Sequence, residues 1–156
     1  MAIFNFTDSD IRPLINRAVT EIEPLAVAKN ISLKVDITQE LPTVKMDSER
    51  ILQVLRNLIG NAIKFTPNGG HVKVSARPVE QGMEVSVADT GHGVPREDLN
   101  IIFDKFKQAM ITSYNKIKGT GLGLAIVKHI IKAHGGKVWV ESELRHGSTF
   151  IFVLPA

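Results

Sequence analysis

Two pairs of segments with alternating apolar and polar residues constrain the fold of this chain more than any other feature of its sequence. Residues 71–77 and 83–89 form the first pair, with Gln81 and Gly82 in the turn, and residues 137–142 and 148–154 form the second. Strict alternation predicts strands with one buried face. A short turn between two such strands predicts a β-hairpin. The pairs therefore favour an antiparallel or mixed sheet.

Three further segments carry apolar residues at helical spacing. A capping-box pattern from Thr7 to Asp10 predicts that a first helix opens there. Asp47 is expected to cap a second helix that runs to about residue 65, and a third helix is expected from about residue 122 to 133. Residues 31–37 alternate and are expected to form a strand. Strands and helices do not alternate regularly, so the expected fold is α+β: a two-layer α/β sandwich with a mixed, mostly antiparallel sheet and its helices on one face.

The composition excludes several classes of protein. The length of 156 residues is typical of one domain, and the absence of cysteine excludes disulfides and thiolate metal sites. No apolar run approaches the roughly 18 residues of a membrane span, and the N-terminus lacks a signal-peptide pattern. We therefore expect a cytoplasmic chain without membrane contact, although its parent protein could be membrane-anchored. The charge of +3 is not gathered into a basic stripe, which argues against nucleic-acid binding.

Asn57, Asn61 and Lys64 are spaced to lie on one face of the second helix. Asn is a poor helix former, so two of them among apolar residues call for a reason. An amide oxygen is a hard ligand suited to Mg²⁺, and a lysine one turn away can neutralise phosphate charge. The alternative is a polar stripe that faces solvent.

Two glycine-containing segments also suggest nucleotide binding. Asp89 leaves an apolar strand and is followed by Gly91 and Gly93, which allow close backbone approach to a flat ligand such as a purine; a strand-ending Asx turn is the alternative. Residues 119–124 read Gly-Thr-Gly-Leu-Gly-Leu and enter a helix. Backbone N–H groups at a helix N-terminus bind anions, but no Gly-Lys-Ser/Thr follows as in a P-loop, and a purely structural role stays open.

The order of the asparagine-containing helix, the Asp89 segment and residues 119–124 resembles that of the ATP-binding motifs in the sensor histidine kinases. The resemblance lies in an N box at residues 57–65, a first glycine box at 89–94, an F box at 103–106, a second glycine box at 119–124 and a closing strand at 147–155. It covers the chain from about Thr7 to Pro155. It implies the Bergerat-type ATP-binding fold shared with gyrase, Hsp90 and MutL.

The resemblance implies three catalytic residues, Asn57, Lys64 and Lys107, and one metal ligand. Asn61 would coordinate Mg²⁺ through its amide oxygen, and Lys64 would meet the phosphates. Asn57 stands where gyrase-type ATPases carry a glutamate base; an amide cannot deprotonate water, which suits transfer to a protein histidine. Lys107 stands where the family often carries an Arg, and it keeps the charge without bidentate geometry.

The same resemblance implies the residues that bind ATP. Asp89 would accept a hydrogen bond from the adenine amino group, and Thr149 would add a water-mediated contact nearby. The others would line the adenine, anchor a lid over residues 107–118, or wrap the triphosphate: Gly91, Gly93, Val94, Phe103, Phe106, Gly119, Thr120, Gly121, Leu122, Gly123 and Leu124.

None of the five histidines lies in the sequence context of the family's phosphoacceptor, so we expect structural or surface roles for all of them. Residues 1–156 are expected to form one catalytic domain, with the acceptor hairpin and sensor domains outside it. The implied function is binding of Mg-ATP and donation of its γ-phosphate to a histidine on a separate dimerisation domain, which serves a response regulator indirectly. An ATPase or an anti-sigma-type serine kinase of the same fold, or a nucleotide-binding regulatory module without transfer activity, remains open.

Overall fold

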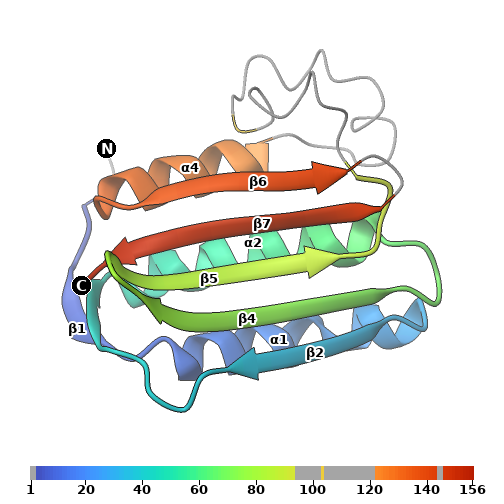
Figure 1. Ribbon diagram of the computed structural model, residues 1–156, viewed down its shortest axis with the longest axis horizontal. Helices are drawn as coiled ribbons and strands as arrows, with labels where there is room; N and C mark the ends of the chain where they lie inside the picture. The colour runs from blue at the N-terminus through green and yellow to red at the C-terminus, as the bar shows by residue number, and fades with distance from the viewer. Residues whose placement is uncertain (1–2, 94–102, 104–121, 144–145) are drawn as a thin grey trace.

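The computed structural model describes residues 3–93, 103, 122–143 and 146–156. Along the chain the elements are β1 (Thr7–Ser9), α1 (Arg12–Ala28), β2 (Ser32–Ile37), β3 (Val44–Met46), α2 (Ser48–Phe65), β4 (His71–Val79), β5 (Gly82–Asp89), α4 (Leu122–Ala133), β6 (Lys137–Glu143) and β7 (Gly147–Pro155). Figure 1 shows helices α1, α2 and α4 behind a twisted sheet. None of the described helices is long and apolar enough to cross a membrane.

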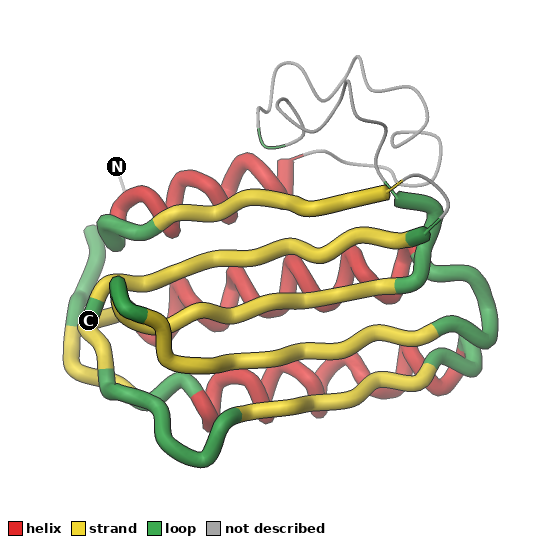
Figure 2. The backbone as a smooth tube through the Cα atoms, viewed as in Figure 1, coloured by secondary structure: helices red, strands yellow, loops and turns green. Residues whose placement is uncertain are grey.

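The main sheet has five strands in the order β2-β4-β5-β7-β6 (Figure 2). The edge strand β2 runs parallel to β4, and the remaining neighbours are antiparallel. Both expected hairpins are present. The sheet is therefore mixed and mostly antiparallel, as the sequence predicts.

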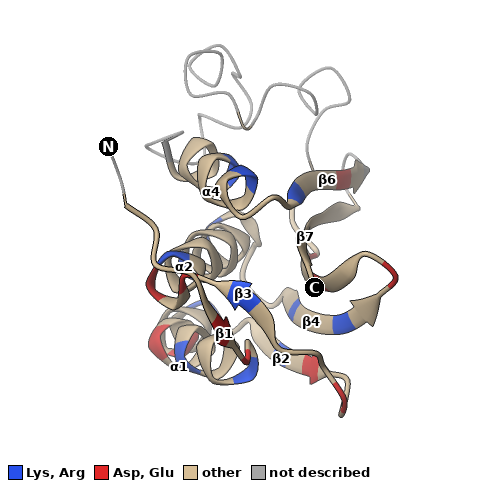
Figure 3. Cartoon of the chain, turned by 90° about the vertical axis from the view of Figure 1, so that its left-hand side faces the viewer, with Lys and Arg blue, Asp and Glu red and all other residues tan. Residues whose placement is uncertain are grey.

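Helices α1, α2 and α4 cover one face of the sheet, and the view from the side separates the two layers (Figure 3). The alternation in β5 explains the core: Met83, Val85 and Val87 are fully buried, while the residues between them face away from the helices. From the other layer, α2 contributes a buried stripe that includes Leu55 and Leu58. The α/β sandwich expected from the sequence is confirmed.

The start of the chain differs from the prediction. Residues Thr7–Ser9 do not open a helix; they form β1, which pairs antiparallel with β3. Helix α1 begins at Arg12, whose N–H donates to Asp10 Oδ1 at 3.0 Å. The physical reason is that β3 supplies hydrogen-bond partners for the backbone of β1. In a helix, the first N–H groups would have no partner within the helix.

Asp47 joins three elements at the N-terminal end of α2. Its Oδ1 accepts from Arg50 N at 3.3 Å, as expected of a helix cap, and its Oδ2 accepts from Asn5 N at 3.0 Å. Its own N–H donates to Nε2 of the buried His134 at 3.0 Å. Because Nε2 accepts this bond, Nδ1 is the ring nitrogen that donates to Ile130 O, at 2.8 Å.

These contacts give His134 a structural role, whereas His71, His92, His129 and His146 are exposed. Replacing His134 with Leu is expected to lower the free energy of unfolding by about 1–3 kcal/mol, because the buried N–H of Asp47 loses its acceptor. Urea denaturation measures the change. His129→Leu, on the helix α4 that ends just before His134, is the control, and an equal loss in both variants would contradict the role of His134.

Candidate nucleotide-binding site

The described motif residues gather at one end of the sandwich. Here β5 ends at Asp89, α2 ends at Phe65 and α4 begins at Leu122, on the right-hand side in Figure 1. The strand order makes β7 the neighbour of β5, so the start of β7 lies beside Asp89. The end of β5, the end of α2 and the start of β7, which are far apart in the sequence, therefore lie close together beside Asp89.

Asp89 is a buried acid with backbone donors around it. Its side chain is 9% exposed, and its Oδ1 accepts from Gly91 N at 2.8 Å. Burial raises the pKa of the Asp89 carboxyl above its ordinary value, while the N–H groups of Gly91 and Ser148 and the nearby His92 oppose that shift. A buried carboxylate of this kind can accept a further hydrogen bond from a ligand.

The turn after Asp89 lies against the end of α2. A Cβ added to Gly91 would stand 2.7 Å from the Phe65 carbonyl oxygen, so only glycine allows this approach. The hydroxyl of Thr90 accepts from His71 N at 3.0 Å, which ties the same turn to the start of β4. Gly93 has a φ of 77°, a left-handed conformation that suits glycine.

Asn57 of α2 lies close to the start of α4. Asn57 and Asn61 are half-buried and Lys64 is exposed. A Cβ added to Gly123 would stand 3.3 Å from Asn57 Oδ1, so the first turn of α4 approaches the N box closely. The arrangement offers amide oxygens, the chemistry that Mg²⁺ prefers, next to the backbone of a helix N-terminus.

Two of the other expected site residues, Leu124 and Phe103, are buried in the hydrophobic core. Leu124 is 2% exposed and joins the hydrophobic core. Phe103 is also buried, and its ring meets that of Phe150 edge-on with centroids 6.0 Å apart. Leu122 is the first residue of α4. Val94, Phe106, Lys107, Gly119, Thr120 and Gly121 lie outside the described residues.

Ser148 lies beside Asp89, although the sequence analysis did not single it out as a candidate site residue. It pairs with Asp89 across the sheet and is buried beside it, whereas Thr149 pairs with Ala88. A pocket of about 360 Å³ is lined by Asp89, Ser148 and Thr149 together with four neighbours. The sequence pattern could have indicated Ser148. Side chains alternate along a strand, so Ser148 and Thr149 point to opposite faces of the sheet.

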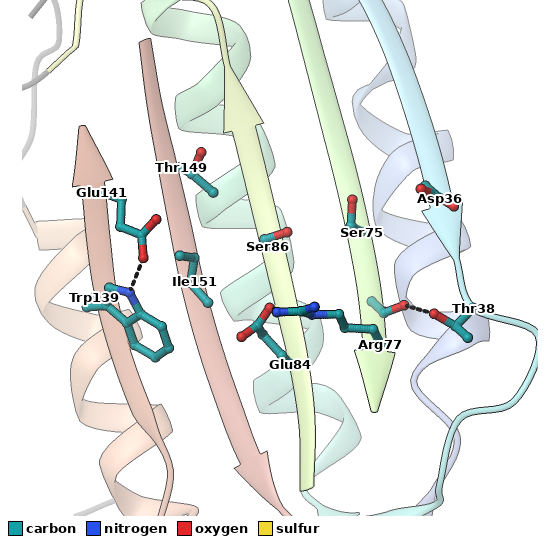
Figure 4. A pocket seen from close by; sticks show the side chains of 11 residues that line it. Asp36, Thr38, Ser75, Arg77, Glu84, Ser86, Trp139, Glu141, Thr149 and Ile151 are labelled. Atoms are coloured by element: carbon teal, nitrogen blue, oxygen red, sulfur yellow. Dashed lines mark hydrogen bonds and ion pairs between the residues drawn. The ribbon is translucent and has the colours of Figure 1, made fainter. Parts of the chain in front are cut away.

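A second hollow, of about 410 Å³, lies on the sheet face opposite the helices (Figure 4). Trp139 forms one side and donates from Nε1 to Glu141 Oε2 at 3.1 Å. Arg77 and Glu84 form an ion pair of 3.0 Å at its rim. Thr149 lines both this hollow and the pocket at Asp89.

Comparison with known proteins places these features in a family. Residues 46–156 match the model of the histidine kinase-, DNA gyrase B- and HSP90-like ATPases. The adaptive-response sensory kinase SasA of Synechococcus sp. (strain CC9902) is 38% identical over 154 residues, which are 98% of this chain and 40% of the relative. The chain thus spans about two fifths of the length of that curated relative.

Solved structures agree with the fold and the family. The catalytic domain of histidine kinase ThkA superposes with a TM-score of 0.85 at 34% identity, over 97% of this chain and 96% of that one. Full-length ShkA in complex with AMPPNP gives a TM-score of 0.85 at 35% identity, over 99% of this chain and 32% of that one. ThkA in complex with response regulator protein TrrA gives 0.79 at 32% identity, over 96% and 41%. This chain belongs to the histidine kinase-, DNA gyrase B- and HSP90-like ATPases, and it is a catalytic ATP-binding domain of the histidine-kinase type.

Proposed function

We propose that this domain binds ATP together with Mg²⁺ and donates the γ-phosphate to a histidine on a separate dimerisation and phosphotransfer domain. The observation that carries the proposal is the meeting of three groups at one end of the sandwich. These are the buried carboxylate of Asp89, the amide side chains of Asn57 and Asn61, and the N-terminus of α4.

The proposed roles follow from the chemistry of each group. Asp89 accepts from the adenine amino group, with Ser148 beside it, Thr149 at the edge of the same pocket, and Gly91 and Gly93 leaving room for the ring. Asn61 would hold Mg²⁺ through its amide oxygen, and the ion would supply charge neutralisation for the phosphates. The first turn of α4 directs backbone N–H groups toward the phosphates.

The same assignment separates this domain from an ATPase. A water molecule needs a general base to attack a phosphate, and the amide of Asn57 cannot take a proton. Lys64 and Lys107 keep their positive charge and are proposed to stabilise the phosphoryl group in transit. We therefore propose transfer to a protein side chain, with only slow hydrolysis of ATP.

The proposed partners come from the relatives. SasA is more than twice as long as the matched region, and ThkA forms a complex with a response regulator. We propose that the acceptor histidine lies on a dimerisation domain of the parent kinase and that a response regulator receives the phosphate from it. Because ATP is abundant in the cytoplasm, we propose that the domain works there.

The test combines this domain with labelled ATP and Mg²⁺, alone and with the dimerisation hairpin of its parent kinase. We expect acid-labile label on the hairpin, no stable label on the domain alone, and little release of inorganic phosphate. Acid-labile label on the domain alone would mean that one of its own histidines accepts the phosphate. Rapid phosphate release without any protein label would favour an ATPase instead.

A further inference from the structure

Lys29 lies outside every motif discussed above, yet its side chain reaches the end of the helix that carries Asn61. It follows α1, and its half-buried side chain extends across to the last turn of α2. Its Nζ donates to Ile63 O at 2.8 Å and to Lys64 O at 3.2 Å. Among the described residues, Lys29 takes part in none of the side-chain ion pairs, so its charge serves the helix end.

The side chain of Lys29 caps carbonyl groups at the C-terminal end of α2. The last carbonyls of a helix lack partners within it and carry partial negative charge. In α2, Thr66 supplies both its N–H and its hydroxyl to Ala62 O, at 3.1 and 2.7 Å. Lys29 supplies the next two carbonyls. The two residues thus cap the C-terminus of α2, one from its own loop and one from another helix.

The capped turn is the part of α2 that faces the site. Asn61 immediately precedes this turn and Lys64 lies in it, and its final carbonyl, on Phe65, is the atom that Gly91 approaches so closely. A displacement of this turn would therefore move both the proposed metal ligand and the turn that follows Asp89.

Lys29 also holds the loop that follows α2. Its carbonyl accepts from Gly69 N at 3.1 Å. The next residue, Gly70, is adjacent to Thr90, because a Cβ added there would stand 2.9 Å from Thr90 Oγ1. Two separate routes, one through Phe65 and one through this loop, connect Lys29 to the turn beside Asp89.

We propose that Lys29 is a positioning residue of the nucleotide site: it fixes the last turn of α2 against the Asp89 turn without being part of the motifs. The inference rests on the proposed function, because it assumes that ATP binds between these segments. The charge and the donors of Lys29 both matter in this role, so an arginine at this position should substitute for it in large part.

The test compares Lys29→Met, which keeps the length of the side chain, with Lys29→Arg and with the control Lys34→Met. Lys34 is exposed on β2. Calorimetry with Mg-ATP is expected to show a loss of affinity of about ten-fold for Lys29→Met, the scale of hydrogen bonds from a charged group. The Arg variant and the control should stay close to wild type. Amide NMR shifts of Asn61 and Gly91 in the nucleotide-free protein should move in Lys29→Met only.

A purely structural role would lower the melting temperature and leave the affinity of the folded protein unchanged, and that result would overturn the proposal. Thr66→Val covers the case in which Lys29→Met does not fold. It removes one hydroxyl bond at the same helix end and should weaken Mg-ATP binding in the same direction, with unchanged affinity as the contrary result. If the wild-type domain binds no ATP, both the proposed function and the role of Lys29 are wrong. If the wild-type domain binds ATP and the variants bind it with equal affinity, only the role of Lys29 is wrong.

Discussion

Replacing Asp89 with Asn is expected to weaken ATP binding by about ten- to a hundredfold, while the domain stays folded. The variant keeps the shape of the side chain. It exchanges a carboxylate, which only accepts, for an amide that can present a donor to the adenine amino group. For the same reason the wild-type domain should bind GTP poorly, because guanine offers a carbonyl oxygen where adenine has its amino group.

Calorimetry with ATP and GTP measures both effects, and Asp36→Asn is the matched control. Asp36 lies on β2, and its ion pair with Lys73 is long and exposed, at 3.5 Å; such a pair contributes little. Equal affinities of the wild-type domain for ATP and GTP would refute the role of Asp89 in adenine recognition.

The same variant tests the electrostatics of the nucleotide-free site. The pKa of Asp89 is raised in the folded domain above its ordinary value of 3.8, so ionisation of this carboxyl opposes folding. Its stability contribution is present at low pH and is lost as the pH rises through the raised pKa. The free energy of unfolding of Asp89→Asn, relative to wild type, should therefore increase with pH from about 4 upward. A difference that is independent of pH would contradict the burial of this charge.

Local sequence signals predict most of the fold, and they also explain why the prediction of a helix that opens at Thr7 is wrong. The second helix has both a cap at Asp47 and a long apolar stripe, so its expected ends match α2, Ser48–Phe65. The strands β1 and β3 have three residues each, which is too short for alternation to be recognised. The sequence does not reveal that Thr7 pairs with Met46 in a neighbouring strand. The sequence alone therefore favours the interpretation of Thr7 as a helix cap.

The site could be predicted only where a motif carries it. Asp89 and the asparagines of α2 belong to recognisable segments, and the fold brings those segments to one end of the sheet. Lys29 carries no such signal, since its partners Ile63 and Lys64 are more than thirty residues away in the sequence. Contacts of this kind depend on how α1 packs beside α2, which local pattern does not determine.

Asn61 gives the second large effect, which concerns the metal. If its amide oxygen holds Mg²⁺, then Asn61→Ala should bind adenosine or metal-free ADP nearly as wild type does and lose the gain in ATP affinity that Mg²⁺ provides. Phosphotransfer to the acceptor domain should fall by more than about a hundredfold, because a metal contributes several kcal/mol of charge stabilisation in the transition state.

Titrations with and without Mg²⁺ separate this role from a structural one. Gln53→Ala is the control, since Gln53 is a half-buried amide two turns earlier on the same helix. A structural defect at position 61 would weaken every nucleotide alike, with or without the metal. A loss confined to Mg-ATP, together with normal binding of adenosine, is the pattern that only a metal ligand produces, because adenosine has no phosphate for the ion to bridge.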